Sequence, residues 1–250
     1  MAFLRSLLHM LWMLVTVVPC ALVLLAAAVL RVNGHRLYLI AAFWLGLAIH
    51  GAKYLLGIRY EVQGRENLPQ PGQAVVLLVK HQSTYETFLM PVIMPNDLAY
   101  VFKRELLYVP FFGWAIGRLD MVHIDRKLKS QAFNKVVQQG RELLAKGVWV
   151  IMFPEGTRIP RGQAGKYKSG GARLAIETGV PVIPVAVNSA VCWPRKAFVK
   201  HPGLVTVSIG PMIHSTGREP DELMHEVEQW IEAEMHKLDP SAYPPPAVVR

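Results

Sequence analysis

The chain has 250 residues, enough for one sizeable α/β domain with a small addition. It is 52% hydrophobic and carries 27 Lys and Arg against 18 Asp and Glu, a formal net charge of +9. A hydrophobic chain with a basic balance is typical of proteins that lie on anionic membranes. Because no run of Lys and Arg is interleaved with aromatic residues, we expect no nucleic-acid partner.

The N-terminal segment has the composition of a membrane anchor. Residues 6–30 contain no Asp, Glu, Lys or Arg and are long enough to cross a hydrocarbon core of about 30 Å. The alternative is a secretory signal, but its apolar region typically has about 7–15 residues, so we expect this run to be retained. A second apolar stretch, residues 37–51, either spans the bilayer or lies in one leaflet as the second arm of a helical hairpin. Residues 1–56 are therefore predicted to form hydrophobic anchoring helices.

Beyond residue 56, short apolar runs alternate with amphipathic stretches. Strands are predicted at residues 60–62, 74–79, 98–102, 121–124, 148–152, 182–187 and 205–209. Helices are predicted after residue 81 (ended by Pro91 or Pro95) and at residues 111–119, 130–146, 170–178 and 221–238. This alternation predicts an α/β fold, a mixed, mostly parallel sheet flanked by helices and preceded by the N-terminal hydrophobic helical membrane anchor. Residues 240–250 form a Pro-rich tail, predicted to be disordered.

The stretch KHQSTYE at residues 80–86 directly follows a predicted strand. Its His81 and Glu86 would lie roughly 140° apart on a helix and on opposite faces of a strand. Only a turn that runs into a helix lets Glu86 hold one ring nitrogen of His81 and leave the other free to accept a proton. The same residues also fit a capping box, with Ser83 as N-cap and Glu86 as the third helical residue. This stretch alone supports the catalytic and the structural interpretation equally.

A second motif, FPEGTR at residues 153–158, also follows a predicted strand. Gly156 allows backbone amides to approach a ligand closely, and the Arg158 guanidinium matches phosphate oxygens. The alternative is a polar turn with an exposed Arg–Glu pair, which stabilises by about 0–1 kcal/mol. Because chemistry on such sheets gathers at strand ends, His81, Lys103 and Arg158 are expected at one edge of the sheet.

Four blocks of the chain occur in the order typical of the glycerolipid acyltransferase family, which residues 58–215 resemble. The blocks are His81 with Glu86, FKREL at residues 102–106 with Pro110 and Gly113, FPEGTR at residues 153–158, and VPVIPV at residues 180–185. Within the family, the chain most resembles the bacterial 1-acylglycerol-3-phosphate (lysophosphatidic acid) acyltransferases. It differs in one respect, because the family usually has Asp five residues after the His and this chain has Glu86, one methylene longer.

The resemblance implies an acyltransferase domain at residues 57–239. Its implied reaction moves a fatty acyl group from acyl-CoA or acyl carrier protein to the 2-hydroxyl of 1-acylglycerol 3-phosphate, making phosphatidic acid for phospholipid biosynthesis. By the same resemblance, His81 is the general base and Glu86 its orienting partner. Neither Ser83 nor Cys192 has an evident role as nucleophile, so direct attack without an acyl-enzyme is expected.

Five further residues are expected at the substrate. Lys103 and Arg158 are the candidates for binding the acceptor's phosphate, with Gly156 and Thr157 supplying further donors. Glu155 is expected to hold Arg158 or Lys103 in place, since a carboxylate does not favour contact with phosphate. No cofactor and no metal is expected, because His81 and Glu86 without a further His/Asp cluster do not make a zinc site.

An enzyme of this kind is expected at the inner (cytoplasmic) membrane, with its catalytic domain on the cytoplasmic side. The two cysteines, Cys20 and Cys192, make no disulfide framework and fit a reducing compartment. The expected partners are a membrane lysolipid and an acyl thioester, with acyl carrier protein as one possible donor. Two alternatives stay open: an acyltransferase for another lysolipid acceptor, and a catalytically silent lipid-binding protein of the same fold.

Overall fold

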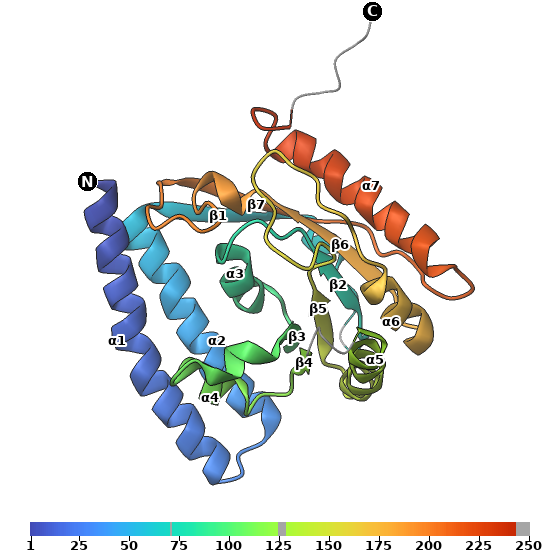
Figure 1. Cartoon of the computed structure of the whole chain (residues 1–250), viewed down its shortest axis with the longest axis horizontal. Helices are drawn as coiled ribbons and strands as arrows, with labels where there is room; N and C mark the ends of the chain where they lie inside the picture. Colours follow the sequence, from blue (N-terminus) through green and yellow to red (C-terminus); the bar gives the residue numbers. More distant parts are fainter. Residues whose placement is uncertain (71, 125–128, 244–250) are drawn as a thin grey trace, which may run out of the picture.

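The computed structural model describes residues 1–70, 72–124 and 129–243, and the side chains of all of these except residues 129–133. Two hydrophobic helices lead into a twisted sheet that has helices on both faces (Figure 1). Residues 244–250, the larger part of the predicted tail, lie outside the described residues. Tyr243, which the sequence assigns to that tail, is instead buried against the domain.

The described part of the chain forms a seven-stranded sheet with the order β1-β7-β6-β2-β5-β3-β4. Its strands are β1 (Ile58–Gln63), β2 (Val76–Val79), β3 (Leu98–Lys103), β4 (Val122–Ile124), β5 (Trp149–Met152), β6 (Val182–Val187) and β7 (Gly203–Ile209). Neighbouring strands are parallel except for the antiparallel pair β6 and β7. The predicted mixed, mostly parallel sheet is confirmed, and each predicted strand overlaps an observed one.

The helices also follow the prediction. They are α1 (Ala2–Val29), α2 (Gly34–Gly51) with its π-helical continuation η1 (Ala52–Leu56), α3 (Tyr85–Ile93), α4 (Phe112–Ile116), α5 (Lys129–Ala145), α6 (Gly170–Thr178) and α7 (Pro220–Leu238). Pro91 lies inside α3, which ends before Pro95. A proline leaves the carbonyl four residues earlier without its helical donor, and here the Tyr100 hydroxyl donates to that carbonyl, on Thr87, at 2.8 Å. The short 3₁₀ turns η2 (Arg65–Asn67), η3 (Arg104–Tyr108) and η5 (Ser189–Val191) were not predicted, because such short turns carry no periodic signal.

The central strand β2 is buried on both faces. Leu77 and Val79 pack into the hydrophobic cluster beneath α3 and the end of the N-terminal hairpin. Val76 and Leu78 pack into a second cluster, which α5, α6 and α7 cover. A strand covered on both sides needs no polar face, which explains the unbroken apolar run in the sequence.

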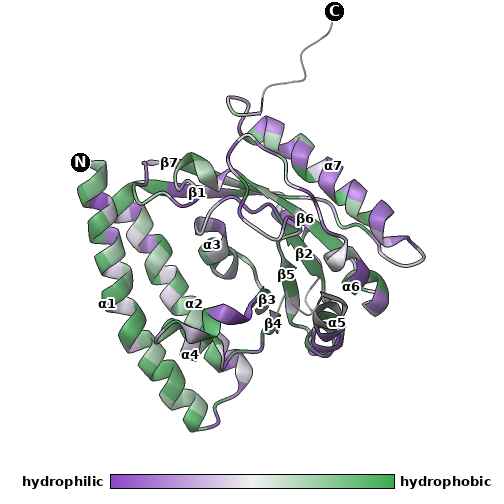
Figure 2. Ribbon diagram, viewed as in Figure 1, coloured by the Kyte–Doolittle hydropathy of each residue, from purple (hydrophilic) through white to green (hydrophobic). Residues whose placement is uncertain are grey.

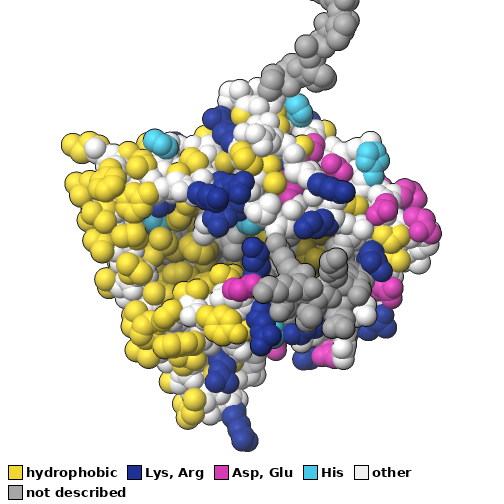
Figure 3. Space-filling model, in the orientation of Figure 1, with side chains coloured by type: hydrophobic (Ala, Val, Ile, Leu, Met, Phe, Trp, Pro, Cys, Tyr) yellow, Lys and Arg dark blue, Asp and Glu magenta, His cyan; other side chains and the backbone are white. Residues whose placement is uncertain are grey.

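Helices α1 and α2 form a hairpin beside the sheet, and both are predominantly hydrophobic (Figures 1 and 2). The segments Ala2–Val29 and Gly34–Leu56 are long and apolar enough to cross a membrane. Large hydrophobic side chains stay exposed on the hairpin, among them Leu4, Leu11, Val15, Leu22 and Phe43. Figure 3 shows hydrophobic side chains covering the side of the molecule where the hairpin lies in Figure 1. This surface favours association with a membrane.

The hairpin is packed onto the rest of the protein near both of its ends. Close to the N-terminus, the Lys200 N–H donates to Ser6 Oγ at 2.9 Å. Midway along the hairpin, the Trp44 ring packs edge-on against Phe88 and Phe112, with centroids 5.6 and 6.1 Å apart. Near the hairpin turn, His35 Nδ1 lies 2.9 Å from Asp97 Oδ2. The hairpin and the domain are therefore one packed structure.

Candidate active site

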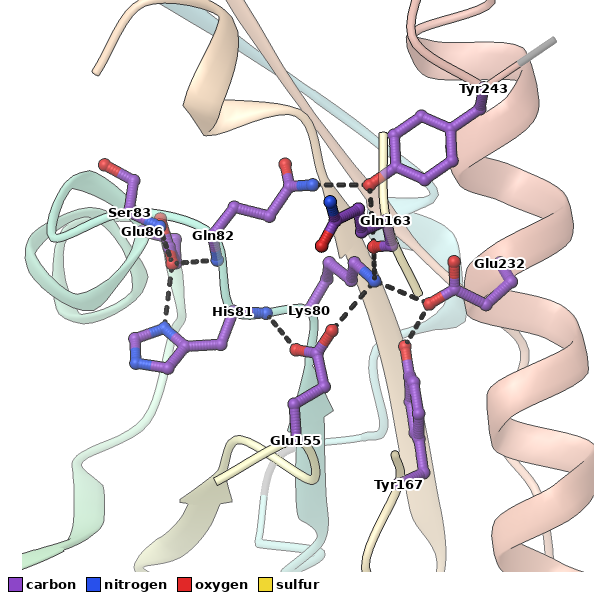
Figure 4. A network of polar contacts seen from close by, with 10 residues as sticks. All are labelled: Lys80, His81, Gln82, Ser83, Glu86, Glu155, Gln163, Tyr167, Glu232 and Tyr243. Carbon is purple, nitrogen blue, oxygen red and sulfur yellow. Dashed lines mark hydrogen bonds and ion pairs between the residues drawn. The ribbon is translucent and has the colours of Figure 1, made fainter. Parts of the chain in front are cut away.

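His81 and Glu86 meet at the carboxyl end of β2 (Figure 4). His81 lies in the turn after the strand, and Glu86 is the second residue of α3. His81 Nδ1 is 2.9 Å from Glu86 Oε1. The turn into a helix that their spacing requires is the geometry observed.

Glu86 is fully buried and held by further donors. Its Oε1 also accepts the backbone N–H groups of Gln82 and Ser83, at 2.8 and 2.7 Å. Its Oε2 accepts the hydroxyl of Ser189 at 2.6 Å. Since Oε1 serves only as an acceptor for these groups, His81 Nδ1 carries the ring proton and Nε2 has the free lone pair.

The capping interpretation of this stretch is also partly correct. Ser83 Oγ accepts the N–H of Tyr85 at 3.0 Å, while Glu86 accepts the N–H of Ser83 in return. The helix begins at Tyr85, later than an N-cap at Ser83 implies. One carboxylate therefore fixes both the start of α3 and the ring of His81, so the two interpretations do not compete.

The His81 ring is fixed on one face and accessible at its edge. It stacks on Phe153, with ring centroids 3.9 Å apart and planes inclined by 19°. Its side chain is 16% exposed, and no described residue forms a hydrogen bond with Nε2. This nitrogen is available to a substrate.

The FPEGTR loop at residues 153–158 lies beside His81 because β5 is the sheet neighbour of β2. On its other side, β5 pairs with β3, which ends at Lys103. Gly156 has a φ of +67°, and a Cβ there would lie 2.9 Å from Lys168 Nζ. The loop therefore needs glycine, and the ammonium group of Lys168 lies directly against it.

Arg158 points toward the start of α3. Its Nη1 donates to Thr84 Oγ1 at 2.7 Å, which uses one of its five N–H donors. Thr157 and Lys103 are exposed, and Lys and Arg side chains gather on the surface beside the hydrophobic side (Figure 3). Topology thus brings His81, Lys103 and Arg158 to one edge of the sheet, as the sequence predicts.

Glu155 has partners other than those expected. Its Oε1 lies 2.8 Å from Lys80 Nζ, and its Oε2 accepts the backbone N–H of His81 at 2.7 Å. The prediction that Glu155 holds Arg158 or Lys103 is therefore wrong. Residue 155 follows its strand with the side chain turned into the protein, where the buried Lys80 offers a countercharge.

Four residues that contact the active-site turn or its partners were not predicted from the sequence: Lys80, Ser189, Glu232 and Tyr243. Lys80 at the end of an apolar strand was a usable signal, since a buried Lys needs a carboxylate partner. Glu232 was not recognisable, because it resembles the other acidic residues of α7. Ser189 lies in an unpredicted 3₁₀ turn.

An apolar cavity of about 140 Å³ lies between the hairpin and the site. Its lining comes from α1, α2, α3, β3 and α4, and includes Leu24, Ala41, Phe88, Tyr100 and Ile116. One water needs roughly 10–15 Å³ of such space, so the cavity has room for a chain of several methylene groups. It borders the site, because the Tyr100 ring lies 6.2 Å from Phe153, which stacks on His81.

Within the described ranges, no group of three or more His, Cys, Asp or Glu side chains is arranged to hold a metal ion. Cys20 and Cys192 are both free thiols. Burial raises the pKa of Cys192 to about 11, so this thiol is protonated at neutral pH.

The chain is similar in sequence and in structure to known proteins. Residues 59–188 match the family model described as Acyltransferase. The chain is 45% identical over 213 residues to a Pseudomonas aeruginosa protein named 1-acyl-sn-glycerol-3-phosphate acyltransferase, with 82% of each chain covered. It is 33% identical over 204 residues to the mouse 1-acyl-sn-glycerol-3-phosphate acyltransferase alpha, covering 81% of this chain and 70% of that protein. The crystal structure of the 1-acyl-sn-glycerophosphate (LPA) acyltransferase PlsC from Thermotoga maritima superposes with a TM-score of 0.78 at 25% identity, covering 96% of this chain and 98% of that one.

Proposed function

The chain belongs to the acyltransferase family, and from this premise we propose that it transfers a fatty acyl group from a thioester to the 2-hydroxyl of 1-acylglycerol 3-phosphate. The product is phosphatidic acid, as expected for an enzyme of phospholipid biosynthesis. The observation that carries the proposal is the His81–Glu86 pair, with a free Nε2 at the sheet edge that also holds Arg158 and Lys103. Relatives named for this reaction cover most of the chain.

In the proposed reaction, His81 Nε2 takes the proton of the acceptor's hydroxyl as its oxygen attacks the thioester carbonyl. A carbon–oxygen bond forms, the carbon–sulfur bond breaks, and His81 returns the proton to the departing thiolate. Glu86 keeps the ring oriented and stabilises the imidazolium formed between these steps. General acid–base catalysis of this kind typically contributes about 10²–10⁴-fold.

Arg158 and Lys103 are proposed to bind the acceptor's phosphate, with Gly156 and Thr157 supplying donors. A guanidinium binds phosphate oxygens bidentately, and an ammonium contributes a point charge. Because Glu155 is buried and engaged elsewhere, its proposed role is to shape the loop rather than to contact substrate.

An acyl chain is proposed to lie in the apolar cavity beside the hairpin. The cavity is lined by hydrophobic side chains and borders the Phe153 ring that contacts His81. A chain there would enter from the side of the molecule that favours lipid. The hydrophobic effect would contribute about 0.8 kcal/mol for each buried methylene.

We further propose that the hairpin lies in the cytoplasmic leaflet of the inner membrane. A hairpin that packs on the domain near both of its ends does not cross about 30 Å of hydrocarbon unless the domain enters too. The test is Asn33→Cys at the hairpin turn, in a Cys20→Ser background, with a membrane-impermeant maleimide. Labelling from the cytoplasmic side is expected, and labelling from the opposite side would contradict the proposal.

The function is tested with the purified full chain in detergent or lipid. Acyl-CoA and acyl carrier protein donors are offered separately, each with 1-acylglycerol 3-phosphate and with competing lysolipids. We expect transfer to the phosphate-bearing acceptor to dominate. Transfer to all acceptors alike would favour another lysolipid specificity, and lipid binding without transfer would favour a catalytically silent protein.

A further inference from the structure

Behind the active-site turn lies a buried cluster of charges that the proposed reaction does not use. Lys80 is fully buried at the end of β2. Its Nζ lies 2.8 Å from Glu155 Oε1 and 2.6 Å from Oε1 of Glu232, a residue of α7 (Figure 4). The Tyr167 hydroxyl donates to the same Glu232 oxygen at 2.8 Å, and the carbonyl of Gln163 accepts from Lys80 at 3.3 Å.

This cluster is connected to the backbone of the catalytic histidine. Glu155 Oε2 accepts the His81 N–H at 2.7 Å, while the His81 carbonyl accepts the Ile159 N–H at 2.7 Å. Both main-chain groups of His81 are thus held by the segment that follows β5. The position of Glu155 in turn depends on Lys80 and, through it, on Glu232.

The turn after α7 adds two more contacts to the same region. Gln82, the residue after His81, donates through Nε2 to the Tyr243 hydroxyl. Arg161 forms a bidentate pair with Asp239, with both N–O distances at 2.7 Å. All of these α7-side residues lie beyond residues 59–188, the part that matches the family model.

We propose that Lys80 and Glu232 are positioning residues that hold the His81 turn through Glu155, so that α7 is a working part of the active site. This inference rests on the proposed function for its catalytic meaning. Neither residue contacts substrate. Their role is to keep Nε2 of His81 in the position and orientation from which it reaches the acceptor's hydroxyl. A misplacement of about 1 Å can lower the rate about 10²-fold.

The charges around Glu155 make this role measurable. The Glu155 carboxylate faces Lys80 at the end of β2, Glu232 on α7, and the hydroxyls of Tyr167 and Tyr243. Burial raises the pKa of Glu155, and the Lys80 ammonium opposes that shift, whereas Glu232 adds to it. Burial lowers the pKa of Lys80, but the two carboxylates outweigh it and leave that pKa above its ordinary value.

The experiment compares Lys80→Met and Glu232→Gln with the wild type in the full chain. Without Lys80, the pKa of Glu155 rises further, so the acid limb of the kcat profile moves to higher pH. Glu232→Gln instead removes a negative charge near Glu155, so the pKa of Glu155 falls and the acid limb moves to lower pH. We expect kcat to fall about 10–100-fold in Lys80→Met and less in Glu232→Gln, because Gln still accepts from Lys80.

A second readout does not depend on activity. Labelling with ¹⁵N-histidine gives amide signals for nine histidines, and the His81 signal is identified by its loss in His81→Asn. We expect this amide proton to move upfield in Lys80→Met, because its short hydrogen bond to Glu155 weakens. If the wild type transfers no acyl group, the proposed function fails, and the amide signal still decides whether Lys80 positions His81.

Matched controls and a rescue complete the test. Lys237→Met and Glu226→Gln make the same changes in exposed ion pairs of α7, with Glu234 and Arg218, and should leave kcat and the amide signal unchanged. Lys80→Met/Glu155→Gln removes the titrating carboxyl group, so the acid limb should no longer lie at higher pH than in the wild type. The proposal is overturned if Lys80→Met leaves the His81 amide and the acid limb in place. If Lys80→Met does not fold, the proposal is overturned by a Glu232→Gln protein whose His81 amide signal and acid limb both match those of the wild type.

Discussion

His81 Nδ1 lies 2.9 Å from Glu86 Oε1, and the same oxygen accepts two backbone N–H groups of the turn that carries His81. A single carboxylate therefore fixes the ring and the main chain together. The other oxygen is fixed by Ser189 at 2.6 Å. The extra methylene of Glu, compared with the Asp usual at this position, is accommodated in a fully buried site in which both carboxylate oxygens have partners.

Shortening this side chain should harm both activity and stability. In Glu86→Asp the carboxylate withdraws by about one bond length, so it does not reach His81 and Ser189 at once. We expect kcat to fall at least about tenfold, and the free energy of unfolding to fall by about 1–3 kcal/mol because a buried hydroxyl loses its partner. Steady-state kinetics and denaturant unfolding measure the two effects. Ser189→Ala is the control, and equal kinetic losses in both variants would show that the contact with His81 is not the cause.

The phosphate sites predict a change in acceptor binding rather than in chemistry. Arg158→Gln and Lys103→Met should each raise KM for 1-acylglycerol 3-phosphate about 10–100-fold, since a charge-assisted hydrogen bond contributes about 1.5–3 kcal/mol. The same variants should change KM for 1-monoacylglycerol, which lacks the phosphate, far less. Lys146→Met, in the turn between α5 and β5, is the control. Equal effects on both acceptors would remove Arg158 and Lys103 from the phosphate site.

The cavity beside the hairpin predicts a change in chain-length preference. Ala41→Phe adds a ring to the cavity lining and should displace two or three methylenes of a long acyl chain. At about 0.8 kcal/mol for each, kcat/KM for long chains relative to short ones should fall about 10–50-fold. Leu39→Phe, at an exposed position on α2, is the control. An unchanged preference in Ala41→Phe would place the chain elsewhere.

The bidentate pair between Arg161 and Asp239 predicts a pH-dependent contribution to stability. Burial raises the pKa of Asp239, but hydrogen bonds from Arg161 and Ser241 outweigh it and leave the pKa below its ordinary value. This stabilisation is therefore fully present above the ordinary carboxyl pKa of about 4 and is lost as pH falls through the lowered value.

The corresponding variant is Arg161→Gln. Since the Arg161 side chain is 41% exposed, we expect a loss of about 1 kcal/mol at neutral pH. The difference from wild type should shrink as the pH is lowered below about 4. Denaturant unfolding from pH 7 to pH 3 measures it. Arg218→Gln, whose acidic partners are exposed, should cost less, and a loss independent of pH in Arg161→Gln would contradict the assignment.

The fold was predictable because its signals are local. Apolar runs such as residues 74–79 and 182–187 mark buried strands, and their alternation with amphipathic helices predicts the sheet. The spacing of His81 and Glu86 permits their contact in one local geometry only, a turn into a helix, but their catalytic roles were implied only by the resemblance to the acyltransferase family. The strand order, which brings Lys103 and residues 153–158 beside His81, was not itself predicted. These residues were expected near His81 only from the general rule that chemistry gathers at the strand ends of such sheets.

Which carboxylates pair with the buried Lys80 was not predictable, because the charges of this cluster come from distant parts of the chain. Lys80 and Glu232 are 152 positions apart, and nothing in the pattern of α7 distinguishes Glu232 from its solvated acidic neighbours. Likewise, the burial of Tyr243 depends on a tertiary contact with Gln82 that a Pro-rich composition conceals. Local periodicity reports which face of an element is apolar, but it does not report which charges meet across the fold.

The central claim, that His81 with Glu86 catalyses acyl transfer, is tested most directly with His81→Ala. The purified variant and the wild type are compared for acyl transfer to 1-acylglycerol 3-phosphate and, separately, for binding of the same lysolipid. The account predicts that kcat falls by about 10²–10⁴-fold while the lysolipid binds with nearly unchanged affinity. Transfer at the wild-type rate by a correctly folded His81→Ala protein would contradict it.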